Sequence, residues 1–221
     1  RGTGTGTLAA GDCLLGTGQL VDYFSTTLAA ASAEEFVLTS TAFDAFAYLF
    51  DSAGRLVAID DNAGGGTNSA LRVFAPAGQY LVGASSATAG ATGAYSLTSR
   101  ALTARTTCIA GWIIPGITLG GSLATGDCTF SDGSFVDGYT VYLRAGQQIT
   151  LTQRSTAFDT YLILANAAGT SVAEDDDSGG GAGGTDSRIV YTATATGTFQ
   201  ILANSFAAGQ TGAYTLTVTT P

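Results

Sequence analysis

The chain has 221 residues, enough for one large domain or two of ordinary size, and its formal net charge is −9. This acidic balance argues against nucleic-acid binding, because neutralising phosphates requires a basic patch, and it also disfavours anionic membrane surfaces. No apolar run is long enough to span a bilayer. With 11% charged residues, 31 glycines and short apolar runs, the composition favours an all-β protein rich in turns.

The residue types that are missing limit the chemistry. The chain contains no histidine, lysine or methionine. Without histidine there is no Ser-His-Asp triad and no histidine-based zinc site, and without lysine there is no Schiff base. We therefore predict that the protein is not an enzyme. The lack of methionine predicts a processed start, and the Thr-, Gly- and Asp-rich composition predicts an extracellular or cell-surface location.

One stretch of the chain occurs twice. Residues 40–62 read STAFDAFAYLFDSAGRLVAIDDN, and residues 155–177 read STAFDTYLILANAAGTSVAEDDD. The copies align without a gap at an offset of 115 residues, so Asp44 corresponds to Asp159 and Asp60 to Asp175. A repeat of this length indicates a duplicated structural unit, and it predicts two domains of about 100 residues each.

The chain opens with RGTGTGT at residues 1–7, which we expect to be a flexible arm unless another strand pairs with it. The first domain is expected over residues 8–100. Short apolar runs between turn residues predict its strands at Leu20–Thr27, Glu35–Thr39, Ala45–Phe50, Leu56–Ile59, Leu71–Phe74, Gln79–Ala84 and Ala94–Thr98.

Residues 101–121 connect the two domains and contain an apolar segment with Trp112, Ile113 and Ile114. One interpretation is that this segment packs against the start of the second domain or between the domains. The alternative is an exposed patch that contacts another molecule.

The second domain is expected over residues 122–221. Its strands are predicted at Phe135–Leu143, Gln148–Gln153, Thr160–Ala165, Ser171–Ala173, Arg188–Thr192, Thr198–Ala203 and Ala213–Val218. Many short strands and no helical periodicity predict two tandem antiparallel β-sandwiches of jelly-roll or Greek-key type.

The chain contains three cysteines, so at least one of them has no disulfide partner within the chain. Cys13 and Cys128 are repeat equivalents in Leu-Ala-x-Gly-Asp-Cys segments, whereas Cys108 lies in the connecting segment. The simplest disulfide is Cys108–Cys128, which closes a loop of about 20 residues and stabilises the fold by about 3 kcal/mol. Cys13 is then either a free thiol or a partner in an intermolecular bond.

A long ordered series of motifs runs through the second copy. It comprises Leu-x-x-Gly-Asp-Cys, Val136-Asp137-Gly138-Tyr139, Ser-Thr-Ala-Phe-Asp-x-Tyr-Leu, Asp175-Asp176-Asp177, Asp186-Ser187-Arg188-Ile189, Gly197-Thr198-Phe199 and Thr211-Gly212-Ala213-Tyr214-Thr215-Leu216. This series resembles the bacterial pre-peptidase C-terminal (PPC) domain, and the resemblance covers nearly the whole chain as two tandem copies. The first copy departs from the pattern at Ala70-Leu71 and at Asp60-Asp61-Asn62.

The resemblance implies a secreted β-sandwich of the kind appended to extracellular proteases and other secreted or surface proteins. Related collagen-binding domains of clostridial collagenases share this sandwich, bind calcium and attach to fibres. No catalytic domain accompanies the two copies in this sequence.

The acidic clusters are the candidate metal site, with calcium as the expected cofactor. Carboxylate oxygens are the ligands that calcium prefers, and the candidates are Asp159, Asp175, Asp176 and Asp177 in the second copy and Asp44, Asp60, Asp61 and Asn62 in the first. The alternative is an Asx-rich turn whose carboxylates accept backbone N–H bonds.

Several aromatic residues are candidates for a carbohydrate platform. They are Tyr23, Phe24, Tyr48 and Phe50 in the first copy and Tyr139, Tyr142 and Tyr161 in the second. Aromatic residues on strands more often belong to the core, so burial is the expectation for this set.

Two functions from different classes remain. The first is a non-enzymatic structural subunit that associates with copies of itself into an extracellular filament or matrix, through the arm, the Trp112 segment and Cys13. The alternative is an accessory module of a secreted hydrolase or adhesin that binds a polymer such as polysaccharide or collagen. An exposed row of aromatics on one sheet face would favour this alternative.

Overall fold

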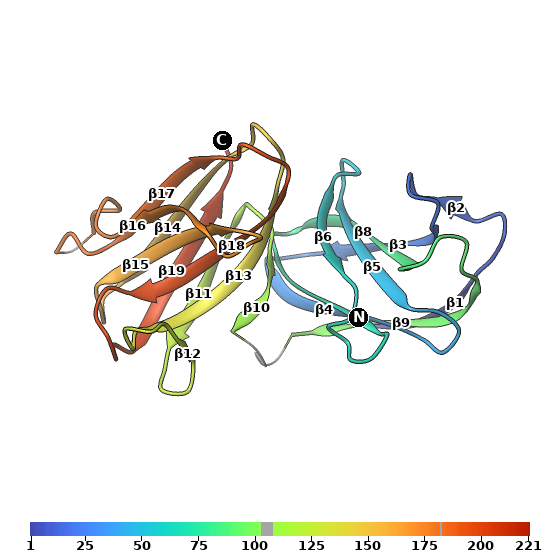
Figure 1. Cartoon of the computed structure of the whole chain (residues 1–221), viewed down its shortest axis with the longest axis horizontal. Helices are drawn as coiled ribbons and strands as arrows, with labels where there is room; N and C mark the ends of the chain where they lie inside the picture. The colour runs from blue at the N-terminus through green and yellow to red at the C-terminus, as the bar shows by residue number, and fades with distance from the viewer. Residues whose placement is uncertain (103–107, 182) are drawn as a thin grey trace. The chain divides into compact units, whose positions relative to one another are not determined.

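The structure is a computed structural model that describes residues 1–102, 108–181 and 183–221. The chain forms two compact units, Arg1–Thr103 and Ala104–Pro221 (Figure 1). Both are built from β-strands, and the described residues contain no helix that could cross a membrane. The predicted all-β class is confirmed.

Unit 1 is a sandwich of two antiparallel sheets. Its strands are β1 (Gly2–Leu8), β2 (Cys13–Leu14), β3 (Leu20–Leu28), β4 (Ser32–Ser40), β5 (Ala45–Asp51), β6 (Leu56–Asp60), β7 (Ser69–Ala75), β8 (Gly78–Ser86) and β9 (Gly93–Ala101). One sheet has the order β1-β9-β4-β7 and the other β2-β3-β8-β5-β6. Most connections therefore cross from one sheet to the other, as in jelly-roll folds.

Unit 2 repeats this arrangement and adds one strand. Its strands are β10 (Ile109–Ile113), β11 (Ile117–Leu123), β12 (Cys128–Thr129), β13 (Phe135–Leu143), β14 (Gln148–Ser155), β15 (Thr160–Asn166), β16 (Ser171–Asp175), β17 (Ser187–Thr192), β18 (Gly197–Ser205) and β19 (Gly212–Thr219). One sheet has the order β11-β19-β14-β17. The other is β10-β13-β18-β15-β16, in which β12 also pairs with β13.

The two units agree in register as well as in strand order. Val21 lies opposite Ser85 on β8, and the equivalent Val136 lies opposite Asn204 on β18. The loop that follows the acidic strand differs in length, because β16 and β17 are separated by eleven residues and β6 and β7 by eight. The longer glycine-rich loop is thus inserted without displacing the strands on either side.

The core of each unit comes from strand alternation, because successive side chains point to opposite faces of a sheet. In β5, for example, Ala45, Ala47 and Leu49 are buried between the sheets. In unit 2 the core includes the hydroxyl of Tyr214, which donates a 2.7 Å bond to the buried carboxylate of Asp137.

The N-terminal segment is not a flexible arm. Residues 2–8 form β1, which pairs with β9 along its whole length from Gly2 opposite Ser99 to Leu8 opposite Gly93. Glycine is needed at position 6 because the ring of Tyr95 lies over it, and a Cβ atom there would clash with the hydroxyl oxygen. Gly2 and Gly4 meet no such close neighbour.

The connecting segment is also part of a sandwich. Its residues form β10, which pairs in parallel with β13, and β11, which pairs with β19. Ile113 and Ile114 are buried and Trp112 is half-buried, so this stretch is not an exposed contact patch. The fourteen strands predicted for the two domains are all present, with ends that shift by three residues at most.

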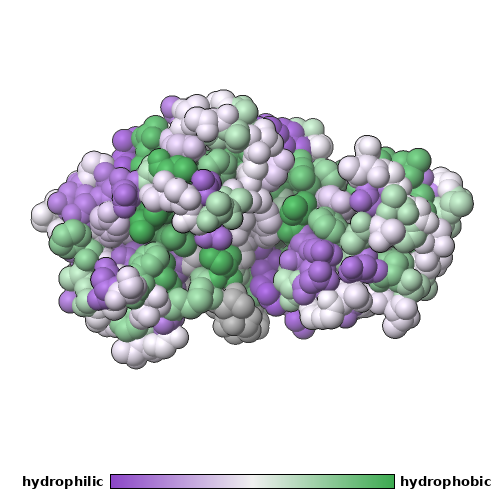
Figure 2. Space-filling view, in the orientation of Figure 1, coloured by the Kyte–Doolittle hydropathy of each residue, from purple (hydrophilic) through white to green (hydrophobic). Residues whose placement is uncertain are grey.

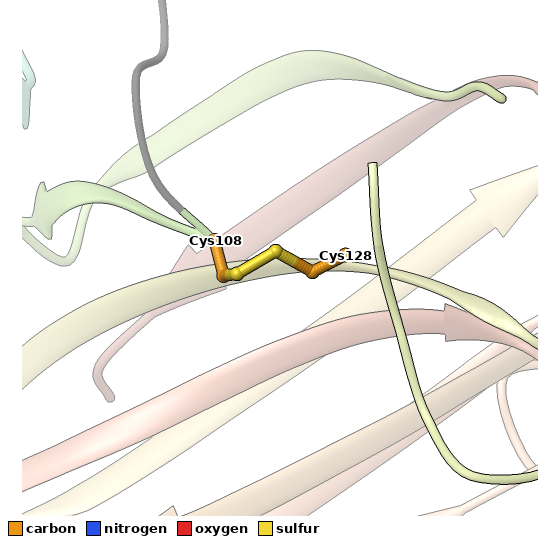
Figure 3. The surroundings of a disulfide bond; sticks show 2 residues. All are labelled: Cys108 and Cys128. Carbon is orange, nitrogen blue, oxygen red and sulfur yellow. A yellow bond between two sulfur atoms is a disulfide. The ribbon is translucent and has the colours of Figure 1, made fainter. Parts of the chain in front are cut away.

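The predicted disulfide between Cys108 and Cys128 is present, with a Cα–Cα distance of 5.5 Å. Figure 3 shows it joining the start of the β10 segment to the Cys128 backbone. Cys13 of unit 1, which corresponds to Cys128 of unit 2, is a free and exposed cysteine.

Candidate cation site and aromatic face

The acidic cluster of unit 2 lies where β15 begins and β16 ends. Because these strands are antiparallel, with Leu162 opposite Asp175, Asp159 comes close to the residues that follow β16. One carboxylate oxygen from each of Asp159, Asp176 and Asp177 lies within 4.8 Å of the other two. Three hard oxygen donors at this spacing suit calcium, which completes its coordination with water or carbonyl oxygens.

Two oxygens of this cluster lack the partners that buried polar atoms normally have. Oδ1 of Asp159 and Oδ1 of Asp176 are buried, and neither has a hydrogen-bond partner within the described part of the chain. The same holds for the equivalent atoms of unit 1, Oδ1 of Asp44 and Oδ1 of Asp61. Leaving such acceptors unsatisfied is costly, and its repetition at both sites fits a role for these atoms as ligands.

The raised pKa values of three of these aspartates also fit a role as cation ligands. Burial and then the negative charge of Asp177 raise the pKa of Asp159 above its ordinary value. Burial, followed by the charges of Asp177 and Asp159, likewise raises the pKa of Asp176. In unit 1, burial and the charge of Asp44 raise the pKa of Asp61. A bound cation would reverse these shifts, since it favours the ionised carboxylates.

Asp175 and Asp60 differ from the neighbouring aspartates because their carboxylates accept hydrogen bonds from backbone N–H groups. Oδ2 of Asp175 accepts a 2.6 Å bond from the Arg188 N–H and a 3.1 Å bond from the Ser178 N–H. Oδ2 of Asp60 accepts in the same way from the backbone of the following loop and of β7. These two residues fix the loops instead of facing the cation site, so the Asx-turn interpretation is the correct one for them.

The equivalent cluster of unit 1 carries fewer carboxylates. Asn62 takes the place of Asp177, so Asp44 and Asp61 are the only carboxylates among its three candidate ligands. An amide oxygen still coordinates calcium, but it contributes no negative charge. We therefore expect lower cation affinity in unit 1.

Beside this site, unit 1 presents a row of aromatic rings on the outer face of the β2-β3-β8-β5-β6 sheet. Phe46, Tyr48 and Phe50 occupy the outward positions of β5, and their ring centroids are 4.7 and 6.1 Å apart along the row. Tyr23 of β3 continues it, 5.8 Å from Phe50. All four are half-buried or exposed.

The expectation that these aromatics belong to the core is wrong for Tyr23, Tyr48 and Phe50. The core side of β5 is filled by two alanines and a leucine, which leaves its aromatic positions facing outward. The expectation holds for Tyr139, which is buried in unit 2, and Phe24 packs edge-on against Tyr95 at 6.2 Å.

Unit 2 has a smaller aromatic surface at the equivalent place. Tyr161 takes the position of Phe46, lies 6.3 Å from the exposed Phe206, and donates a 2.8 Å bond to Glu174. Tyr142, the remaining candidate, lies under the guanidinium of Arg144 and is half-buried. Figure 2 shows that hydrophobic residues reach the surface at several places on both units in this view.

Comparison with known protein families gives a match within unit 2. Residues 135–205, from β13 to β18, match the family described as "Bacterial pre-peptidase C-terminal domain". No curated protein matches the chain.

Among solved structures, the CUB1-EGF-CUB2 domains of rat MASP-1 are 11% identical, with 98% of both chains covered and a TM-score of 0.25. A secreted protein from Eubacterium rectale is 12% identical, with 90% of this chain and 68% of that chain covered and a TM-score of 0.24. The PBSX exported protein XepA is 9% identical, with 97% and 86% covered and a TM-score of 0.24. Similarity this low supports no conclusion about function.

Proposed function

We propose that the protein is a non-catalytic extracellular binding module that holds a polysaccharide on the aromatic face of unit 1. The observation that carries this proposal is the outward row of Phe46, Tyr48, Phe50 and Tyr23. Exposed apolar surface of this kind marks interaction sites, and flat aromatic rings offer large rigid contact area to the apolar faces of sugar rings. Three of the rings lie along β5 and Tyr23 lies beside them on β3, and an aromatic surface of this length suits an extended polymer better than a small compact ligand.

We infer that calcium binds in the acidic clusters and supports this face. Asp44 precedes β5 by one residue, so the cation site of unit 1 lies at the end of the aromatic row that begins with Phe46. Binding of a cation by Asp44 and Asp61 would hold the start of β5 against the loop after β6. The role of the metal in this proposal is to order the surface and not to activate a reaction.

We also infer that unit 1 is a second copy of the domain matched by residues 135–205. Supporting this are the repeated strand order, the equivalent registers on β8 and β18, and the free Cys13 at the position of Cys128. An extracellular location is supported by the Cys108–Cys128 disulfide, because such bonds persist in oxidising compartments.

Self-association into filaments is the second candidate function. Of the three features that suggested it, the N-terminal arm and the Trp112 segment no longer support it. The N-terminal segment pairs with β9 of its own unit, and Ile113 and Ile114 are buried. Exposed Cys13 is the ground that remains. Negative-stain electron microscopy of the protein with calcium and with chelator would reveal filaments if this candidate is correct.

A pull-down with insoluble polysaccharides tests the binding proposal. Cellulose, chitin and xylan would be compared with insoluble collagen, using the wild type and the variants Phe46→Ala and Tyr48→Ala. Each variant should bind the retained polysaccharide about two- to thirteenfold more weakly, since one stacked ring contributes about 0.5–1.5 kcal/mol beyond its buried area. Val190→Ala, which removes an exposed side chain on β17, is the matched control and should bind as the wild type does.

Two results would contradict the proposal. One is the absence of binding to every polysaccharide, with or without calcium. The other is binding that Phe46→Ala and Tyr48→Ala leave unchanged, which would place the contact elsewhere. Retention on collagen alone would shift the ligand class to protein fibres.

A further inference from the structure

A pair of charged side chains lies on the outer face of the β11-β19-β14-β17 sheet of unit 2, apart from the acidic cluster. Arg154 follows the buried Gln153 on β14, so it points outward, and Thr215 lies opposite it on β19. Asp186 comes directly before β17, whose first residue Ser187 is buried opposite Gln153. Because side chains alternate between the two faces of a sheet, Thr215, Arg154 and Asp186 form a row across three strands.

The glycine-rich loop after β16 folds back over Asp186. The N–H of Gly179 donates a 2.7 Å bond to the carbonyl of Asp186, and the N–H of Asp186 donates a 3.0 Å bond to the carbonyl of Gly180. Gly181 has a φ of 83° and lies so close to the carboxylate that a Cβ atom there would clash with Oδ2 of Asp186. Glycine at position 181 therefore lets the loop backbone cover the carboxylate, and the Asp186 side chain is 7% exposed.

The carboxylate of Asp186 has few partners for a group buried this deeply. Within the described part of the chain, its single polar contact joins Oδ2 to Nη1 of Arg154 over 3.6 Å. A charge-assisted N–H···O bond is about 2.7–2.9 Å long, so this contact does not satisfy the carboxylate, and a buried carboxylate without hydrogen bonds is unfavourable. The Arg154 side chain is 58% exposed, which leaves its guanidinium accessible to another acceptor.

A pocket of about 420 Å³ opens at this charge pair. Arg154, Asp186 and Gly181 line it, and Thr156 and Thr215 are among the residues that complete its wall. The volume lies in the range of small-molecule sites, in which a few polar groups converge on the bound ligand. The buried carboxylate and the guanidinium therefore border a space that a ligand can fill.

Unit 1 does not repeat this charge pair. Thr39 and Asn68 take the positions of Arg154 and Asp186, and Oδ1 of Asn68 accepts a 3.3 Å bond from a backbone N–H. The loop there has eight residues instead of eleven, and a Cβ atom at Gly66 would meet nothing within 4 Å. The covered carboxylate is thus a feature that the longer loop adds to unit 2.

We propose that this pocket binds a neutral sugar through two neighbouring hydroxyl groups, of which one donates to Asp186 and the other accepts from Arg154. A carboxylate only accepts and a guanidinium only donates, whereas a hydroxyl does both, so a vicinal diol satisfies the two side chains together. A cationic ligand would be repelled by Arg154 and an anionic ligand by Asp186, which favours an uncharged ligand.

The size of the pocket limits the ligand further. It has room for about one or two sugar rings, which suits a short oligosaccharide or the end of a chain. The hydroxyls of Thr156 and Thr215 offer additional partners to such a ligand. This inference goes beyond the binding of a polysaccharide by unit 1, because it concerns the other unit and contacts that are polar instead of aromatic.

Two-dimensional NMR of the intact protein tests the site with soluble sugars. The probes are cellobiose and the methyl glycosides of glucose, galactose, mannose and xylose. At least one of them should shift the amide signals of Gly181, Asp186 and Thr215 in a saturable way. A deoxy analogue of that sugar, which lacks one of the two hydroxyls, should have a Kd at least about tenfold higher, because a hydrogen bond to a charged group is lost.

Three variants connect the binding to the charge pair. Arg154→Ala and Asp186→Asn should each raise the Kd of the bound sugar at least about tenfold, for the same reason. Asparagine occupies the equivalent position of unit 1, so Asp186→Asn is compatible with the fold. Arg188→Ala is the matched control, because it removes an exposed arginine of β17 that does not line the pocket, and it should leave the Kd unchanged.

Several results would overturn this inference. One is the absence of amide shifts around the pocket with every sugar, and another is a Kd that the deoxy analogue or Arg154→Ala leaves unchanged. Shifts caused by N-acetyl-lysine amide or by acetate, but by none of the sugars, would assign the pocket to a charged ligand. Sugar binding that Phe46→Ala abolishes and Arg154→Ala does not would leave the proposed function of unit 1 standing without this site.

Discussion

Replacement of Asp176 by asparagine is the most informative test of the cation site. In the absence of metal, Oδ1 of Asp159 and Oδ1 of Asp176 are both unsatisfied within the described part of the chain, and the two charges repel each other. An asparagine at position 176 removes one charge, and its amide N–H₂ can donate to Asp159. The change should therefore stabilise the metal-free protein, although it removes a ligand.

The magnitude follows from these contacts. Satisfying one buried acceptor is worth about 1–3 kcal/mol, which corresponds to a rise in Tm of about 4 °C or more for a domain of about 100 residues. Calcium at about one hundred times its Kd should stabilise the wild type by about 2.7 kcal/mol, and it should stabilise Asp176→Asn much less. Asp176→Asn should thus be more stable than the wild type in chelator and less stable than the wild type in calcium.

Tryptophan fluorescence is a suitable assay, because Trp112 is the only tryptophan and lies in unit 2. Asp175→Ala serves as the control. It removes the loop bonds from the Ser178 and Arg188 N–H groups, and it should lower the Tm with and without calcium. The reasoning would be refuted if Asp176→Asn lowered the Tm in chelator, or if calcium left the Tm of the wild type unchanged.

Three further predictions concern pH and unit 2. The pKa values of Asp159, Asp176 and Asp61 are raised above 3.8, so without metal these groups hold more protons in the folded state than in the unfolded state between that pH and the raised pKa values. The free energy of unfolding should therefore fall as pH rises through this window, and calcium should remove this slope in urea titrations at several pH values. Gly121→Ala should cost about 1–3 kcal/mol in urea unfolding, since its Cβ would meet the ring of Tyr214; a cost below about 0.5 kcal/mol would show that the ring moves aside. Reduction of Cys108–Cys128 should lower the stability of unit 2 by about 3 kcal/mol, and an unchanged melt would show that the loop is held without it.

Much of the fold could be predicted from the chain because the repeat offset reveals its duplication. What could not be predicted was the role of the Gly-Thr segment. Propensity alone assigns Gly2–Thr7 no core, since neither residue type supplies apolar bulk. The requirement for small side chains appears only when the ring of Tyr95 is placed over Gly6, and that ring is far away in sequence. The sequence does show that Gly6 and Gly121 lie at the same distance before Cys13 and Cys128, so a glycine recurs at this position in both copies.

The acidic triplet shows a similar limit. The sequence predicts a cluster but cannot assign tasks within it, since Asp175 and Asp176 are chemically identical. The structure separates them, because Asp175 ends β16 and accepts bonds from the Ser178 and Arg188 N–H groups, whereas Asp176 and Asp177 follow the strand and lie close to Asp159.

The aromatic row was misjudged for a physical reason. In β5 both faces are apolar, with Ala45, Ala47 and Leu49 alternating with three aromatics, so hydrophobicity alone does not say which face is inside. The bulkier set was expected in the core, but close packing between the sheets is satisfied by the smaller set.

The duplication with one unpaired cysteine also has a consequence for how the chain reaches its native state. Cys108 has two near-identical potential partners, Cys128 at a separation of 20 residues and Cys13 at about 95. The longer loop costs about 1.4 kcal/mol more chain entropy to close, which favours the native bond about tenfold while the chain is still unfolded. Synthesis from the N-terminus acts in the opposite direction, because Cys13 and Cys108 both emerge before Cys128. Early pairing of β1 with β9 would complete the fold of unit 1 and so disfavour a non-native Cys13–Cys108 disulfide.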